Sequence, residues 1–136
     1  MIVFLDANAL IYLIEGAEPF AGRVRARLAG VEREFPGARL ALSRLSWLEC
    51  RIRPMRGNEQ SVLAAYDAFF ARPDLIWVEL GKDVVELATA IRARHGLRTP
   101  DALQAACCLQ LGPEHRFFSG DAAFGRVAGL NVEMLE

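Results

Sequence analysis

Four acidic residues in this sequence stand where their side chains could do chemistry together: Asp6, Glu49, Asp101 and Asp121. Carboxylate oxygens are hard ligands that suit Mg²⁺ or Mn²⁺, and a cluster of carboxylates without basic partners repels itself unless cations fill it. Two such ions roughly 4 Å apart can activate water and stabilise the leaving oxygen when a phosphodiester bond is cleaved. The set therefore suggests metal-dependent hydrolysis.

Each acid taken alone also has a purely structural explanation. Asp6 and Asp121 follow short apolar runs and can cap a helix or stabilise a turn, and Asp101 suits the first turn of a predicted helix. Glu49 lies four residues before Arg53, and such a pair stabilises an exposed helix by roughly 0.3 kcal/mol. Asp6 is the most unusual, because an unpaired buried charge needs a partner, a proton or a metal. The hypothesis therefore depends on all four together.

The hydrophobic pattern predicts strands that alternate with helices, which is typical of a parallel sheet. The third strand is expected at 75–80, a helix is expected to end near Pro54, and Thr99 is expected to cap the helix in which Pro100 takes the first position. We expect an α/β three-layer sandwich with a central parallel sheet of four or five strands and helices on both faces. The remaining strands are expected at 2–5, 39–43, 115–119 and 131–135, and the remaining helices at 8–16, 20–35, 59–71, 83–96 and 121–127.

This arrangement would bring the acids together. In open parallel sheets the ligand crevice lies outside the carboxyl ends of the strands. Asp6 and Asp121 follow the first and fourth predicted strands, Glu49 lies in the helix after the second, and Asp101 starts a helix. We therefore expect all four to converge on one edge of the sheet.

Composition limits the classes of protein. The 136 residues are 53% hydrophobic and 24% charged, which indicates one folded domain over 1–136 rather than a disordered chain. The three cysteines form no CxxC pair, so we expect buried thiols rather than a disulfide framework or a zinc site. Because the N-terminus lacks a basic leader and no apolar run approaches the roughly 18 residues of a membrane span, we expect a cytoplasmic protein.

The net charge of −1 provides no overall basic surface for nucleic acid, so any such contact must be local. All but one of the 16 basic residues are arginine, which suits bidentate contacts with phosphate. Arg51, Arg53 and Arg56 follow Glu49 closely and are candidates to bind substrate phosphates. Arginines on solvated helix faces explain the same residues equally well.

Four segments together resemble a known family. The runs LDANAL, SWLE, RTPDALQAA and FFSGDAAF, each containing one of the four acids, are similar in order and over the full length to the acidic motifs of PIN-domain ribonucleases. Length and layout most resemble the VapC-type toxins of toxin-antitoxin pairs. The resemblance implies a metal-dependent endoribonuclease that uses Mg²⁺, with Mn²⁺ as an alternative, and leaves 5′-phosphate and 3′-hydroxyl ends. It also implies that the four acids hold the metal and do the catalysis, while Asn8 and Ser119 support the site.

Two other functions are compatible with parts of the sequence. A haloacid-dehalogenase-like phosphatase also has an apolar strand that ends in an acid such as Asp6, but its second acid would stand where this chain has Asn8. A non-catalytic interaction module on the same fold would have no need for a repulsive acidic cluster. His95 and His115 are too few for a histidine-based nuclease and are expected at a helix end and a strand start.

The apolar composition and the toxin-like length also predict protein partners. The predicted helices 8–16 and 59–71 carry more apolar surface than one thin sheet covers, and large exposed apolar patches usually mark interfaces. We therefore expect RNA as the substrate, a homodimer, and a small antitoxin with a segment that lies across the acidic groove.

Overall fold

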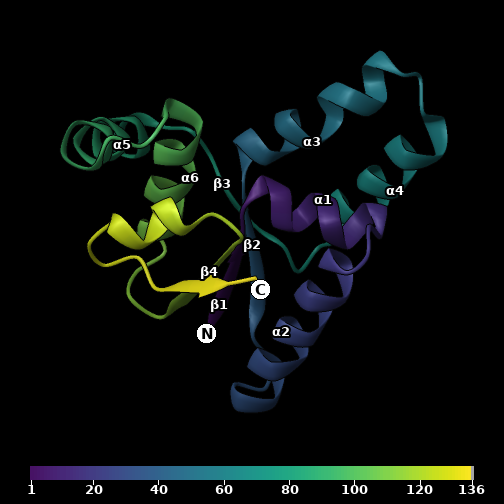
Figure 1. Cartoon of the computed structure of the whole chain (residues 1–136), viewed down its shortest axis with the longest axis horizontal. Helices are drawn as coiled ribbons and strands as arrows, with labels where there is room; N and C mark the ends of the chain where they lie inside the picture. The colour runs from purple at the N-terminus through teal and green to yellow at the C-terminus, as the bar shows by residue number, and fades with distance from the viewer. Residues whose placement is uncertain (136) are drawn as a thin grey trace.

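The computed structural model of the protein describes residues 1–135 and contains one sheet in which every strand pair is parallel. The strand order is β3-β2-β1-β4-β5, so the first strand lies in the middle (Figure 1). This confirms the predicted α/β sandwich. The strands are β1 (Ile2–Leu5), β2 (Arg39–Ser43), β3 (Ile76–Val78), β4 (His115–Ser119) and β5 (Val132–Met134).

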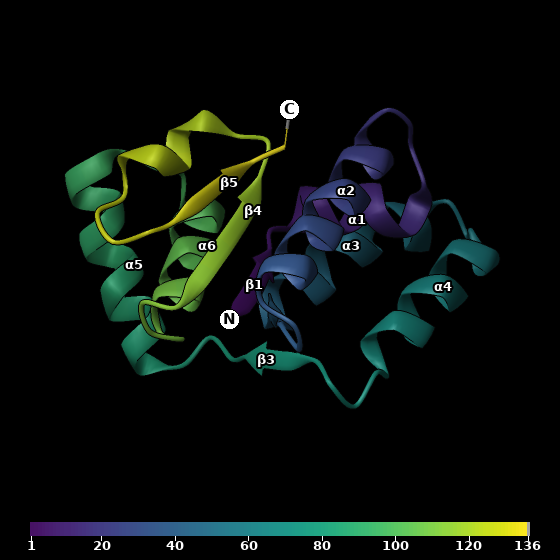
Figure 2. The ribbon, with the colours of Figure 1, turned by 90° about the horizontal axis from the view of Figure 1, so that it is seen from below.

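Six α-helices cover the two faces of this sheet (Figures 1 and 2). Helices α1 (Ala7–Glu15), α2 (Phe20–Glu34), α3 (Arg44–Arg56) and α4 (Gln60–Phe70) lie on one side, and α5 (Lys82–His95) and α6 (Thr99–Leu109) lie on the other. A short 3-10 helix, η1 (Ala122–Arg126), follows β4. The sheet is therefore the middle layer of three.

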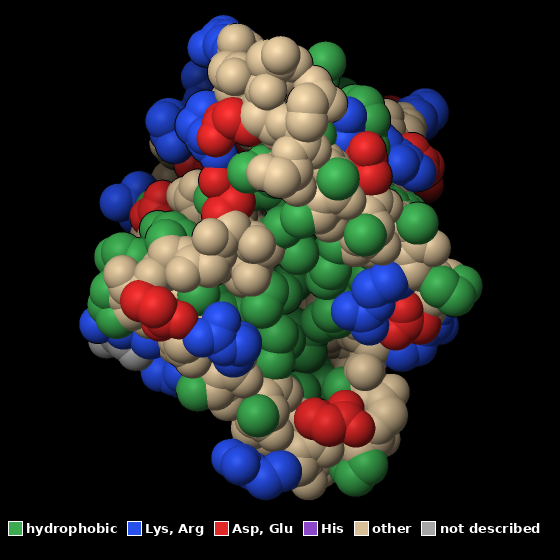
Figure 3. Space-filling model, turned by 90° about the vertical axis from the view of Figure 1, so that its right-hand side faces the viewer, with side chains coloured by type: hydrophobic (Ala, Val, Ile, Leu, Met, Phe, Trp, Pro, Cys, Tyr) green, Lys and Arg blue, Asp and Glu red, His purple; other side chains and the backbone are tan. Residues whose placement is uncertain are grey.

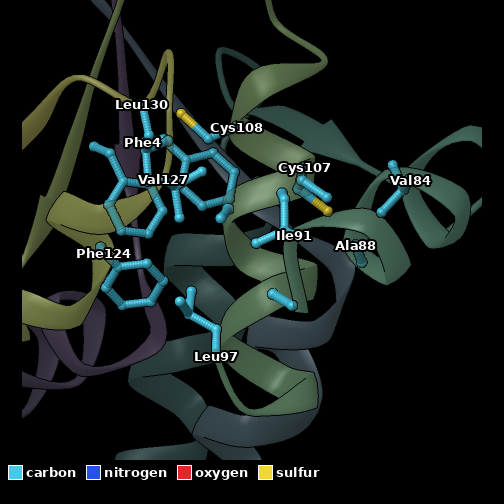
Figure 4. Packing of buried hydrophobic residues seen from close by; sticks show 14 of the residues in the cluster. Phe4, Val84, Ala88, Ile91, Leu97, Cys107, Cys108, Phe124, Val127 and Leu130 are labelled. Carbon is cyan, nitrogen blue, oxygen red and sulfur yellow. The ribbon is translucent and has the colours of Figure 1, made fainter. Parts of the chain in front are cut away.

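Alternation along the central strands divides the core in two. Phe4 and Phe117 belong to the cluster under α5 and α6, part of which Figure 4 shows. Their rings stack with centroids 5.5 Å apart. Leu5 and Phe118, one residue further along each strand, belong to the cluster under α1 to α4. Because successive strand residues point to opposite faces, strands buried on both faces read as continuous apolar runs.

Three boundaries differ from those expected. Helix α3 continues through Pro54 to Arg56; the proline is buried, and its carbonyl accepts a hydrogen bond from Glu59 N–H. Thr99 is the first residue of α6, and the capping position belongs to Arg98, whose side chain makes no capping hydrogen bond. Strand β3 covers only 76–78, at the edge of the sheet, where it has a single neighbouring strand.

Other expectations about the chain are confirmed. Cys50, Cys107 and Cys108 are free thiols and buried. His95 is the last residue of α5, and His115 is the first residue of β4. Among residues 1–135, no helix combines the length and the apolar character needed to cross a bilayer.

Candidate active site

Asp6 lies directly after β1, at the carboxyl end of the central strand, and is only 5% exposed. Its Oδ1 accepts a hydrogen bond from the backbone N–H of Ala9 at 2.8 Å, so the residue caps helix α1. The capping explanation for Asp6 is therefore correct, but it accounts for one oxygen of a buried carboxylate.

Burial raises the pKa of Asp6 from its ordinary value of 3.8 to about 6. Hydrogen bonds from the Ser119 hydroxyl and from the backbone of Ala9 lower this pKa, while the charges of Asp101 and Glu49 raise it further. Desolvation is the dominant cause, because a carboxylate loses more hydration than these two hydrogen bonds replace. A strongly perturbed carboxyl group beside like charges is typical of functional sites.

Asp6, Glu49 and Asp101 line one cavity of about 250 Å³. Glu49 reaches it from α3 and Asp101 from the first turn of α6, on opposite sides of the sheet's end. Three elements far apart in sequence therefore place three of the four predicted acids around the same space. The other lining residues are Ala7, Asn8, Arg98, Pro100, Gln104 and Phe124.

The half-buried Glu49 is held by a neighbour from α6. Burial raises its pKa, a hydrogen bond from Gln104 Nε2 to Glu49 Oε1 at 3.1 Å lowers it, and the charge of Asp101 raises it. Arg98 lies beside Asp101, with 3.5 Å between its Nε and Asp101 Oδ2, and most of its side chain is exposed. The cavity is thus lined by three carboxyl groups, with the exposed guanidinium of Arg98 at its edge.

Asp121, the fourth predicted acid, does not line this cavity. It is exposed, and its Oδ1 accepts a hydrogen bond from Ala123 N–H at 2.9 Å, which caps η1. The buried Ser119 links the two places, because its hydroxyl lowers the pKa of Asp6 and accepts a hydrogen bond from Asp121 N–H at 3.0 Å. Of the two residues predicted to support the site, Ser119 thus lies beside Asp6 and Asn8 lines the same cavity. The catalytic role of Asp121 stays a prediction.

The predicted phosphate-binding arginines on α3 lie outside the cavity. Arg51 pairs with Asp67 and lies over the ring of Trp47, and Arg53 pairs with Glu15 and Glu59. Arg56 is exposed and is also absent from the cavity lining. These side chains mainly join α3 to its neighbours α1 and α4.

Sequence reasoning missed two residues of the cavity, Arg98 and Gln104. Arg98 precedes the helix start that carries Asp101, so proximity in sequence could have identified it. Gln104 follows Asp101 by three residues in the otherwise apolar run ALQAACCL. Residues three apart share one face of a helix, so a lone polar residue at that position was the available signal.

The donor set suits a hard divalent cation in its chemistry. Carboxylate oxygens are the preferred ligands of Mg²⁺ and Mn²⁺, and a cation among these acids would offset both the burial and the smaller mutual repulsion that raise the pKa values of Asp6 and Glu49. Across residues 1–135, no three Asp, Glu, His or Cys side chains already stand at the spacing that holds a metal ion. Binding would therefore draw the three carboxylates closer together.

Comparisons with known proteins agree with this architecture. The family described as "PIN domain" matches residues 3–130, whereas no curated protein matches the sequence. The VapBC2 complex of Rickettsia felis, bound to a DNA fragment from its promoter, has a chain with 15% identity and a TM-score of 0.78, and the match covers 100% of both chains.

Two further solved structures are also similar in fold. VapBC-1 from nontypeable Haemophilus influenzae has 21% identity and a TM-score of 0.71, with 99% of this chain and 98% of that one covered. Mycobacterium tuberculosis VapC20, a sarcin-ricin loop cleaving toxin, has 16% identity and a TM-score of 0.69, with 90% and 92% covered. At sequence identities this low, the TM-scores establish that these proteins share the fold of this chain.

Proposed function

We propose that this chain, which belongs to the PIN domain family, is a divalent-metal-dependent endoribonuclease and the toxin of a toxin-antitoxin pair. The observation that carries the proposal is the cavity at the end of β1, where three carboxylates from separate elements surround one space. The similar folds of the VapBC complexes and of the loop-cleaving VapC20 support the choice of activity. We also propose that residues 1–136 form a single PIN domain.

In this mechanism Asp6, Glu49 and Asp101 would hold the cation. When bound, Mg²⁺ or Mn²⁺ would act as a Lewis acid that lowers the pKa of water and offsets the negative charge of a phosphate. Glu49 is only half-buried, and a carboxylate oxygen of the set that the cation does not occupy could accept the proton of an attacking water. Arg98, which lines the cavity beside Asp101, would hold the substrate phosphate, and Asn8, which lines the same cavity, would orient the carboxylates.

Helix α3 supports the proposed homodimer because its outward face is apolar. The side chains that α3 buries are Ser46, Cys50 and Pro54, which are small and let the helix approach its neighbours closely. Its large hydrophobic side chains instead face solvent and form what we name the α3 stripe. The stripe consists of Trp47, Leu48, Ile52 and Met55, which are 41%, 49%, 40% and 59% exposed.

A complementary hollow lies between α5 and α6. Its volume is about 470 Å³ and its lining is mainly apolar, with Val85, Ala88 and Leu103 among the contributing residues. We propose that the α3 stripe of one protomer packs into the α5–α6 hollow of its partner. Packing the two faces together would remove both apolar surfaces from water, which is the dominant driving force for association.

The antitoxin would take a surface apart from the dimer contact, and its predicted segment would lie across the acidic groove. Figure 3 shows a hollowed band of hydrophobic side chains, flanked by charged ones, on the side of the molecule that carries α1 to α4. Helices α1 and α4, in which the sequence predicts excess apolar surface, lie on this side of the molecule and carry half-buried hydrophobics, including Ile11, Ile14, Val62, Phe69 and Phe70. An amphipathic segment fits such a groove.

The activity is tested by incubating the purified chain with a pool of structured RNAs and, separately, single-stranded DNA. We expect RNA to be cut in Mg²⁺ or Mn²⁺, with 5′-phosphate ends, and to remain intact in EDTA. Glu49→Gln is the matched control for a contaminating nuclease, because it removes one charge and keeps the shape of the side chain. Equal cleavage in EDTA, or by this variant, would overturn the proposal.

A further inference from the structure

Gln104 is the most unusual polar residue among those that line the acidic cavity. It is 2% exposed, and it lies in helix α6, where the neighbouring Ala102, Ala105, Ala106, Cys107 and Cys108 are all buried. Its amide nitrogen donates to Ser46 Oγ at 2.9 Å and to Glu49 Oε1 at 3.1 Å. Both hydrogens of the amide are thus directed at helix α3.

The spacing of these residues makes the contact specific. Ser46 and Glu49 are three residues apart on α3, and Asp101 and Gln104 are three apart on α6, so each pair shares one helix face. The two faces meet at the cavity, which Asp101, Gln104 and Glu49 all line. One amide therefore fixes the rotamer of a carboxylate on the other helix.

The amide oxygen shows that this arrangement is not optimised for folding. Gln104 Oε1 is buried and has no hydrogen-bond partner within residues 1–135. An unpaired buried acceptor costs stability, and an apolar side chain of similar size would avoid that cost. Turning the amide over would place Oε1 against the Glu49 carboxylate, where two acceptors repel. The contact with Glu49 therefore determines which end of the amide faces α3.

We propose that Gln104 is a positioning residue for Glu49, which it holds as a charged ligand aimed at the cation that the cavity would bind. The inference rests on the proposed function, because it assigns Glu49 to the metal. Groups that orient a metal ligand from behind typically contribute about 10- to 100-fold to metal affinity. Gln104 thus acts through Glu49 and does not itself contact the cation.

The test compares the full-length wild type with Gln104→Leu, Glu49→Gln and the double variant, and measures Mn²⁺ binding calorimetrically without RNA. We expect Gln104→Leu to weaken Mn²⁺ binding about tenfold and to leave the melting temperature in EDTA at or above that of the wild type. In the Glu49→Gln background the same change should have no further effect. Gln110→Leu, at the exposed end of the same helix, is the matched control and should bind Mn²⁺ like the wild type.

Cleavage kinetics provide a second readout. Gln104→Leu should lower kcat and leave the KM for RNA unchanged, whereas a merely structural tie between α3 and α6 would lower the melting temperature without changing Mn²⁺ affinity. That structural pattern would overturn the positioning role, as would additive effects in the double variant. If Glu49→Gln itself binds Mn²⁺ and cuts RNA like the wild type, the proposed function fails as well, so the two failures are distinguishable.

Discussion

The carboxylate of Asp6 accepts a hydrogen bond from the backbone N–H of Ala9 at 2.8 Å and also lines the acidic cavity. One side chain therefore caps helix α1 and contributes to the candidate active site. Capping favours any small polar acceptor, whereas metal binding requires a charge, so substitutions can separate the two roles.

The first prediction is that Asp6→Asn melts at or above the wild-type temperature in EDTA. Asparagine caps a helix as well as aspartate does. The substitution also removes the negative charge of a carboxyl group whose pKa is raised to about 6 by burial. Asp6→Ala, which also loses the cap, should be less stable than Asp6→Asn by about 1 kcal/mol. Thermal melts with and without Mg²⁺ measure this, and only the wild type should gain much from the metal. An asparagine variant that melts below the wild type in EDTA contradicts the prediction.

The second prediction concerns pH in the absence of metal. The folded-state pKa of Asp6, about 6, lies above its ordinary value of 3.8, so the folded chain binds the proton first. The free energy of unfolding should therefore rise as pH falls from about 7 to about 4, by roughly 3 kcal/mol at most. Burial also raises the pKa of Glu49, which acts in the same direction.

Paired surface acids oppose this effect at lower pH. Arginine partners lower the pKa values of Glu18, Asp74 and Glu79, and the stability that these acids contribute is lost as pH falls through those lowered values. The informative quantity is thus the difference between the wild type and Asp6→Asn in denaturant titrations across this range. A difference that does not change with pH would exclude the buried Asp6 charge as its source.

The third prediction ranks the acids by activity. Asp6→Asn, Glu49→Gln and Asp101→Asn should each lower kcat by about 100-fold or more, because each removes a carboxylate from the cavity. Asp121→Asn tests the predicted catalytic role of Asp121, which is exposed, lies outside the cavity lining and caps η1, and a loss of kcat below about tenfold would limit that residue to capping. Single-turnover RNA cleavage measures all four. A loss at Asp121 equal to the others would place it among the metal ligands.

The fourth prediction separates the arginines. Arg98→Ala should raise the KM for RNA about tenfold and reduce the salt dependence of that KM, because Arg98 is the positively charged side chain in the cavity lining. Arg51→Ala should leave the KM unchanged and lower the melting temperature, since Arg51 pairs with Asp67 and packs on Trp47. Fluorescence binding to a non-cleaved RNA provides an independent check. The reverse pattern would restore the arginines of α3 as the phosphate contact.

The fifth prediction concerns assembly. Ile52→Glu, in the α3 stripe, should convert the dimer to a monomer, because it places a charge in an apolar contact. Phe20→Glu on α2 is the matched control, since Phe20 and Ile52 are both 40% exposed. Sedimentation at high micromolar concentration distinguishes the two states. A wild type that sediments as a monomer, or equal loss of the dimer in both variants, would contradict the proposed contact.

Much of the fold could be predicted from local patterns in the sequence. The apolar runs of β1 and β4 and the helix-stopping Gly16 and Gly96, both with positive φ, place the elements to within a few residues. Local rules work here because burial on both faces requires unbroken apolar strands, and glycine adopts the left-handed conformation at low cost. The boundary at Pro54 could not be predicted, because it depends on tertiary burial of the proline ring.

For the candidate site, the sequence determined which residue types were available, and the tertiary structure decided which of them meet. Asp6, Glu49 and Asp101 converge because β1 ends, and α3 and α6 begin, at one edge of the sheet, but Asp121 turns back to cap its own 3-10 helix. The crossing of α3 over α6 brings Gln104 against Glu49, at a sequence separation of 55 residues. Side-chain direction and helix crossing depend on packing throughout the core, which no local spacing specifies.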